Sequence, residues 1–80
     1  MTPTPTQAGP VAVNSSLLAK VSYDAGQSVL QLWFCDGAIY RYFGVPATIS
    51  DDLLAAESKG TYFNREIRDW FPYALVRRPR

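Results

Sequence analysis

The sequence predicts an α+β domain in which a three-stranded antiparallel meander is followed by two short helices packed on one face of the sheet. Three runs rich in strand-forming residues come first: LLAKVSYD, VLQLWF and AIYRYF. After Gly44 the apolar residues recur at the longer spacing of helices. The 80 residues leave room for one domain, and its two Trp, five Tyr and four Phe rings supply much of the core.

The domain itself is expected to span residues 14–76. The segment MTPTPTQAGP contains three prolines and three threonines, so residues 1–13 are predicted to be a disordered lead-in. Residues 77–80, RRPR, are expected to form a basic tail in solvent, with attraction of a polyanion as the alternative. Between these ends five bases stand against seven acids, a net charge of −2. This balance argues against a strong nucleic-acid binder and leaves a weak or single-stranded one open.

The turn CDG between the second and third strands decides which side chains face the core. A two-residue turn would place Arg41 among the leucines of the second strand. A three-residue loop that ends in a left-handed Gly37 instead places Leu32 opposite Tyr40 and turns Arg41 outward. Burying an unpaired guanidinium costs several kcal/mol, whereas the choice between two common turns costs about 1 kcal/mol. We therefore expect the three-residue loop.

This register predicts two different faces of the sheet. The inner face should hold Leu30, Leu32, Phe34, Ala38, Tyr40 and Tyr42, joined by Ala19, Val21 and Tyr23 of the first strand. The outer face should hold Gln31 opposite Arg41, Trp33 opposite Ile39, Phe43 near Val29, and Lys20 and Ser22 alongside. Flat rings beside cations are typical of surfaces on which unstacked bases lie. The alternative is that the C-terminal YALV segment, a loop or a second copy covers these rings.

Two helices are expected after Gly44. Ile49 and Leu53 belong to the first, and Phe63, Ile67 and Trp70 to the second, which should stop before Pro72. The expected helix signals are Thr48 or Ser50 as N-cap with Asp51 and Asp52 in the first turn, a left-handed Gly60 at the end of the first helix, and Thr61 as N-cap of the second. The expected core is Leu30, Leu32, Phe34, Tyr40, Tyr42, Ile49, Leu53, Phe63, Ile67 and Trp70. The YALV segment after Pro72 is either a short strand or a packed tail.

The stretch SKGTYFNR is a candidate anion site. A glycine before a helix start presents free backbone N–H groups, and Lys59 and Arg65 flank them with positive charge. The competing interpretation is an ordinary joint between two helices.

The composition excludes several kinds of chemistry. The single Cys allows no internal disulfide, and the lack of His removes the commonest metal ligand and general base, so no metal, no cofactor and no catalytic residue is expected. Cys35 has no nearby base to activate it. No apolar run approaches 18 residues and no export signal is visible, so the sequence predicts a cytoplasmic protein with no membrane partner.

Several short motifs occur together in this chain: Ser15-Ser16, VSYD, LQLWF, YRY, Val45-Pro46 and SKGTYFNREIRDW. In this combination the run from residue 14 to 76 resembles the KTSC domain, which occurs at the C-terminus of some lysyl-tRNA synthetases and as a stand-alone bacterial protein. The central tyrosines of the family correspond to Tyr40 and Tyr42 of this sequence. The role that the resemblance implies is RNA binding.

The expected function is therefore that of a small non-catalytic binding module. The first hypothesis is a weak RNA-binding domain for tRNA or single-stranded RNA. Its binding residues would be Lys20, Trp33, Arg41 and Phe43 on the sheet, with Lys59, Arg65 and Arg68 supplying phosphate contacts. The alternative is a protein interaction or homodimer module that uses the same exposed aromatic residues as anchors.

Overall fold

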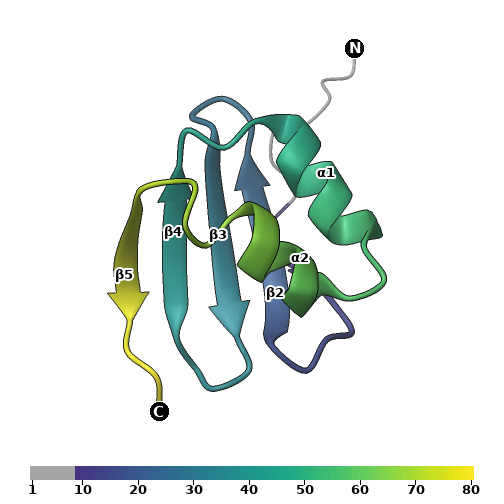
Figure 1. Ribbon diagram of the computed structural model, residues 1–80. Helices are drawn as coiled ribbons and strands as arrows, with labels where there is room; N and C mark the ends of the chain where they lie inside the picture. Colours follow the sequence, from purple (N-terminus) through teal and green to yellow (C-terminus); the bar gives the residue numbers. More distant parts are fainter. Residues whose placement is uncertain (1–8) are drawn as a thin grey trace.

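The structure, a computed structural model, describes residues 9–80 and confirms the α+β class. One five-stranded antiparallel sheet has the order β1-β2-β3-β4-β5. The elements are β1 Val11–Ala12, β2 Leu18–Asp24, β3 Val29–Phe34, β4 Ile39–Phe43, α1 Ala47–Ala55, α2 Lys59–Glu66 and β5 Tyr73–Arg77. Both helices lie on the same side of the sheet, and β5 lies beside β4 at the edge away from them (Figure 1).

The two edge strands change the predicted strand count and domain boundaries. β1 pairs with β2 through Val11 opposite Val21, so the prediction that residues 11–12 belong to a disordered lead-in is wrong. Residues 1–8 of that lead-in lie outside the described range. Of the two alternatives for YALV, a short strand or a packed tail, the structure has the strand. This strand is β5, which also includes Arg77 from the predicted tail. Edge strands this short carry no alternating pattern of burial, so periodicity could not reveal them.

The register of the central hairpin is confirmed. β3 and β4 pair Leu32 with Tyr40 and Gln31 with Arg41. Gly37 adopts the left-handed conformation with φ 97°, which a side chain would disfavour. As expected, the side chain of Arg41 is exposed to solvent.

A β-bulge in β2 makes the prediction for one inner-face residue, Ala19, wrong. The register shifts between Leu18 and Lys20, which places Leu18 opposite Phe34 and fully buries it. Ala19, expected inside, stays partly exposed. A bulge inserts one extra residue in one strand and so changes the face to which the preceding side chains point.

The core forms where the helices cover the sheet. Its buried members are Leu18, Val21, Leu30, Leu32, Tyr42, Val45, Leu53, Phe63 and Ile67. Three other predicted core residues, Phe34, Tyr40 and Ile49, are partly buried and pack against this cluster. Large apolar side chains from both helices and from β2 and β3 thus share one cluster.

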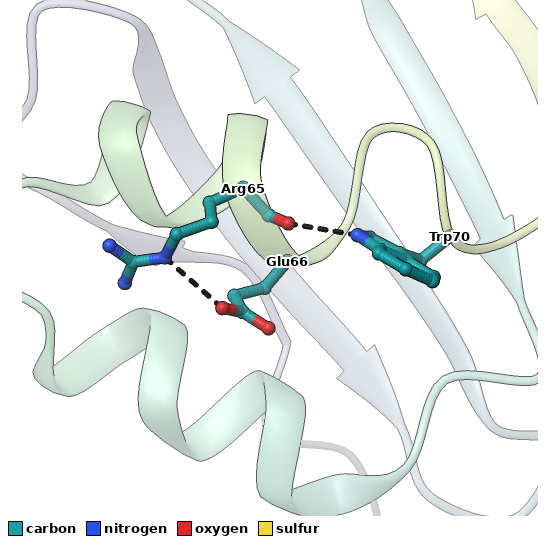
Figure 2. A network of polar contacts seen from close by, with 3 residues as sticks. All are labelled: Arg65, Glu66 and Trp70. Carbon is teal, nitrogen blue, oxygen red and sulfur yellow. Dashed lines mark hydrogen bonds and ion pairs between the residues drawn. The ribbon is translucent and has the colours of Figure 1, made fainter.

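The prediction that Trp70 belongs to the core is wrong. This residue is 70% exposed, and its indole N–H donates to the backbone carbonyl of Arg65 at 2.9 Å (Figure 2). The second helix was expected to continue to Pro72, but α2 ends at Glu66. Helical spacing places a residue on the buried face only while the helix continues, and here it ends four residues before Trp70.

The helix ends also differ from the prediction. α1 begins after Pro46, whose fixed φ suits a helix start, and no side chain caps it, so neither Thr48 nor Ser50 is the N-cap. Asp51 and Asp52 consequently lie in the middle of α1 rather than in its first turn.

The joint between the helices is built around Ser58. Its Oγ accepts from the backbone N–H of Thr61 at 3.2 Å, so the N-cap is Ser58 and not Thr61. Gly60 lies inside α2 and does not end α1. A Cβ added at Gly60 would stand 3.3 Å from Cβ of Leu17, so a glycine lets α2 approach this part of the chain.

Candidate functional site

The helix-free side of the sheet, here called the outer face, presents two aromatic rings. Trp33 is half-buried and Phe43 is 38% exposed. They lie on adjacent strands, and Trp33 pairs with Ile39, four residues from Phe43. At about 3.4 Å per residue the two rings are roughly 14 Å apart along the strands. Each ring therefore offers a separate flat surface.

Cations accompany both rings on the outer face. The ammonium of Lys20 lies 5.7 Å from the ring centroid of Trp33, within the range of a cation–π contact. Arg41 lies between the rings and donates from Nε to Oε1 of Gln31 at 2.8 Å. This bond uses one donor of the guanidinium and leaves its two NH₂ groups for other partners. The predicted combination of Lys20, Trp33, Arg41 and Phe43 on one face is thus present.

The sequence assignment missed a third cation on this face. Arg77 pairs with Ile39 across β4 and β5, and residues directly opposite each other share a face. Asp24 is the carboxylate on this side, and it accepts from the backbone N–H groups of Gly26 and Gln27. The outer face is therefore positive even though residues 14–76 carry a net negative charge. Arg77 went unnoticed because it was assigned to the tail.

The outer face is not covered within the part of the chain that the structure describes. The YALV segment was one expected cover, but β5 extends the sheet beside β4. A shallow depression of about 270 Å³ lies over the middle strands. It is lined by Ser22, Asp24, Gln27, Val29, Gln31, Arg41 and Phe43.

The predicted cations of the second helix lie on the other side of the sheet. Lys59 donates from Nζ to the carbonyl of Ala56 at 2.7 Å and so binds the end of α1. Arg65 pairs with the carboxylate of Glu66 at 3.1 Å (Figure 2). Since the sheet separates these side chains from Trp33, the predicted set does not form one continuous surface. At the predicted anion site SKGTYFNR, Ser58 Oγ accepts from the backbone N–H of Thr61, so the N-terminus of α2 has a side-chain cap.

A hollow of about 480 Å³ lies on the inner face beside α2, where the helices leave β4 and β5 uncovered. The hollow is lined by Leu17, the β3–β4 hairpin, α2 and the residues after it, β5 and the C-terminal tail. The lining residues are Leu17, Phe34, Asp36, Ala38, Tyr40, Tyr42, Phe63, Asn64, Arg68, Asp69, Tyr73 and Pro79. We call it the tyrosine hollow. Arg68, predicted to contact phosphate together with the sheet, lines this hollow instead.

Three tyrosine rings form one wall of the hollow. The centroid of Tyr73 lies 5.4 Å from that of Tyr40 and 5.6 Å from that of Tyr42. Burial raises the pKa of Tyr42 to about 12; Tyr40 and Tyr73 add to the shift and the guanidinium of Arg68 opposes it. The prediction that Tyr40 and Tyr42 face inward is correct, yet it did not reveal the hollow. Its third ring belongs to the segment whose structure was left open.

Residues 9–80 contain no cluster of three or more His, Cys, Asp or Glu side chains that could hold a metal ion. Among these residues, no helix has the length and hydropathy needed to cross a membrane.

Several known proteins are similar to this chain in fold or in sequence. The crystal structure of a KTSC domain protein from Yersinia pestis superposes with a TM-score of 0.83 and 27% identity, covering 89% of this chain and 99% of that one. An uncharacterized protein from Stutzerimonas stutzeri is 44% identical over 55 residues, which are 69% of this chain and 78% of that protein. A protein from Tsukamurella paurometabola is 42% identical over 59 residues, or 74% of this chain and 88% of that one.

The same domain also occurs within larger proteins. A lysine–tRNA ligase from Nostoc sp. is 40% identical over 58 residues, which are 72% of this chain but 10% of the ligase. The KTSC domain family matches residues 14–71, including β2, β3, β4 and both helices. The chain therefore belongs to the KTSC domain family.

Proposed function

We propose that this KTSC domain is a non-catalytic module that binds single-stranded RNA weakly through its outer face. The observation that carries the proposal is the placement of Trp33 and Phe43 on a helix-free sheet face among three cations. Base stacking on an aromatic side chain contributes about 1–3 kcal/mol per base and tolerates different bases. Two separated rings suit two unstacked bases of one strand.

The charges of the outer face support the same proposal. Lys20 and Arg41 stand beside or between the rings, where phosphates that link two stacked bases would pass. The side-chain amide of Gln31, held by Arg41, offers both a donor and an acceptor to a base edge. Few cations take part, so the affinity is expected to be modest and to fall as salt is raised. The occurrence of the domain in proteins named lysine–tRNA ligase is a further argument for an RNA partner.

Tryptophan fluorescence gives a direct test. A Trp70→Phe variant retains Trp33 as its one tryptophan. We expect an eight-nucleotide oligouridine to quench its fluorescence, with an affinity that weakens when salt is raised from 50 to 200 mM. The converse variant, Trp33→Phe with Trp70 retained, should show little quenching because Trp70 lies after α2.

Two matched arginine variants locate the binding. Arg41→Gln should weaken it, whereas Arg65→Gln should leave it unchanged, because Arg65 lies on the helix side and pairs with Glu66. The absence of quenching, an affinity independent of salt, or equal losses for both variants would contradict the proposal.

A second candidate function, self-association, is favoured by the free edge of β5. Tyr73, Leu75 and Val76 are each about half exposed on this strand. An unpaired strand edge can bind the same strand of a second copy. Sedimentation velocity at several protein concentrations tests this. A concentration-dependent dimer that Val76→Lys abolishes supports self-association, and a monomer at every concentration refutes it.

A further inference from the structure

The tyrosine hollow is not used by the proposed RNA surface, since it lies on the opposite face of the sheet. Its volume of about 480 Å³ falls in the range of ligand-binding clefts. It is also the place where segments distant in the sequence converge: β4, the residues after α2, β5 and the C-terminal tail.

The hollow offers hydrogen-bond donors that no protein group accepts. Within residues 9–80 no hydrogen bond joins the hydroxyl groups of Tyr40, Tyr42 and Tyr73 to another protein group, whereas the hydroxyl of Tyr23 donates to the carbonyl of Val45. Tyr42 is 4% exposed as a residue, and no fully buried side-chain oxygen among residues 9–80 lacks a partner, so its hydroxyl is the part of the side chain that reaches the solvent of the hollow. A ligand carbonyl in the hollow could accept from it in place of water. The hydroxyl of Tyr42, whose pKa is raised to about 12, is protonated at neutral pH, as any phenol is, and is therefore a donor.

The charges around the hollow disfavour a phosphate ligand. Two carboxylates, Asp36 and Asp69, line it against one guanidinium, that of Arg68. Asp36 is already engaged, since its Oδ1 accepts from the backbone N–H of Ala38 at 3.0 Å. The remaining lining is aromatic or neutral. A neutral or weakly basic ligand with exposed carbonyl groups fits this chemistry better than a nucleic acid.

An extended proline-rich chain has these properties. It forms a polyproline II helix without internal hydrogen bonds, so its carbonyl groups need outside donors, and its rings pack on aromatic side chains. A proline of the chain itself already lies at the hollow. Pro79 of its own C-terminal segment lines the hollow, where the backbone N–H of Arg80 donates to the carbonyl of Asp36 at 2.8 Å.

We propose that the tyrosine hollow binds an extended proline-rich segment of a partner protein. Proline rings of the partner pack against Tyr40 and Tyr73, and the hydroxyl of Tyr42 donates to a carbonyl of the bound peptide. The partner continues along β4 and β5 from the position that Pro79 occupies. The outer face stays free, so this partner and RNA bind to opposite sides of the sheet.

An NMR titration of the full chain tests the proposal, with decaproline as the probe and a ten-residue Gly-Ser peptide as the control. We expect decaproline to shift the amide resonances of Tyr40, Tyr42, Tyr73 and Arg68 and to leave those of Lys20 and Trp33 in place. Tyr42→Phe keeps the ring and removes the donor, so affinity should fall about 3- to 10-fold, the equivalent of one hydrogen bond. Phe43→Ala, on the outer face, should leave decaproline binding unchanged.

Three results would overturn the proposal. The first is the absence of shifts in the hollow, or equal shifts with the Gly-Ser peptide. The second is that oligouridine, rather than decaproline, shifts the hollow resonances, which would make RNA the occupant. The third concerns residues 1–8, which include TPTP. If deletion of residues 1–8 alone shifts the hollow resonances in the direction opposite to the shifts that decaproline causes, the occupant is the chain's own N-terminal segment and not a partner.

Discussion

The two faces of the sheet carry aromatic side chains in opposite electrostatic settings. On the outer face Trp33 and Phe43 stand apart, with cations beside and between them. On the inner face Tyr40, Tyr42 and Tyr73 contact one another and share the tyrosine hollow with two carboxylates and one guanidinium. The outer rings thus offer flat surfaces to a polyanion, and the inner rings offer hydroxyl donors to a neutral chain.

This difference arises from how the helices cover the sheet. α1 and α2 pack over the cluster that includes Leu30 and Leu32, and there the inner face is sealed. β5 then extends the sheet beyond the helices, which leaves Tyr73 58% exposed. Stability therefore comes mainly from the sealed half of the inner face, and the two proposed binding surfaces, the outer face and the hollow, lie outside it. Separate substitutions should distinguish these three regions.

The largest effect is expected in the sealed half. Leu32→Ala removes a fully buried side chain and should lower the free energy of unfolding by about 2–5 kcal/mol. Phe43→Ala on the outer face removes a larger but exposed side chain and should cost about 1 kcal/mol or less. Urea unfolding followed by circular dichroism measures both. Equal losses would mean that the two faces do not differ in their contribution to stability.

The next effect concerns RNA affinity at the outer face. Trp33→Ala removes one stacking surface and should weaken oligouridine binding roughly 5- to 150-fold, as expected for 1–3 kcal/mol. Trp70→Ala is the matched control, because this tryptophan is more exposed and lies on the helix side. Fluorescence anisotropy of labelled RNA reports both affinities. Similar losses for the two variants would remove the distinction between the faces.

A smaller effect is expected from the protonation of Tyr42. Its pKa rises from 10 to about 12 in the folded protein, so the folded state holds this proton more tightly than the unfolded state does. The resulting stabilisation is complete below pH 10 and is lost as the pH rises toward 12. Its size should be about 1–2 kcal/mol, because the hydroxyl borders a solvated hollow.

Urea unfolding at several pH values between 9 and 12 measures this loss. Tyr42→Phe should remove this part of the pH dependence, and Tyr23→Phe serves as a control at a hydroxyl outside the hollow. An unchanged slope in Tyr42→Phe would show that Tyr42 does not titrate with a raised pKa.

The smallest effect concerns the salt dependence of RNA binding. Arg41→Gln removes one phosphate contact, so the slope of log K against log salt concentration should become less steep by about 0.7. Arg68→Gln, on the inner face, should leave the slope unchanged. Binding isotherms at four salt concentrations separate the two variants. A change in slope for Arg68→Gln instead would place the RNA at the tyrosine hollow.

The register of the β3–β4 hairpin could be predicted because the alternative register would place Arg41 in the core at a high cost in free energy. Turning Arg41 inward would bury an unpaired charge, so the sequence allowed one plausible loop at Gly37. The same alternation could not reveal the bulge that buries Leu18, since a bulge leaves no mark in the pattern. The exposure of Trp70 was missed because helical spacing continues in the sequence beyond the end of α2.

The candidate sites were predictable to different degrees. Three of the four predicted outer-face residues, Trp33, Arg41 and Phe43, follow from one hairpin whose strands are close in sequence, and Lys20 joins them from the neighbouring strand β2. The tyrosine hollow depends on β5 pairing with β4 across both helices, and on the helices leaving that part of the sheet open. Neither condition is a local property of the sequence. Cations of the second helix, such as Arg65, were predicted to act together with the sheet residues, because the sequence alone does not show on which side of the sheet the helices lie.

The most direct test of the account is an NMR titration of the full chain with single-stranded oligouridine at low salt. If RNA binds the outer face, amide and side-chain shifts concentrate at Lys20, Trp33, Arg41 and Phe43 and decrease when salt is raised. Shifts confined to Tyr40, Tyr73 and Arg68, or no shifts at millimolar RNA, would contradict the assignment of RNA binding to the outer face.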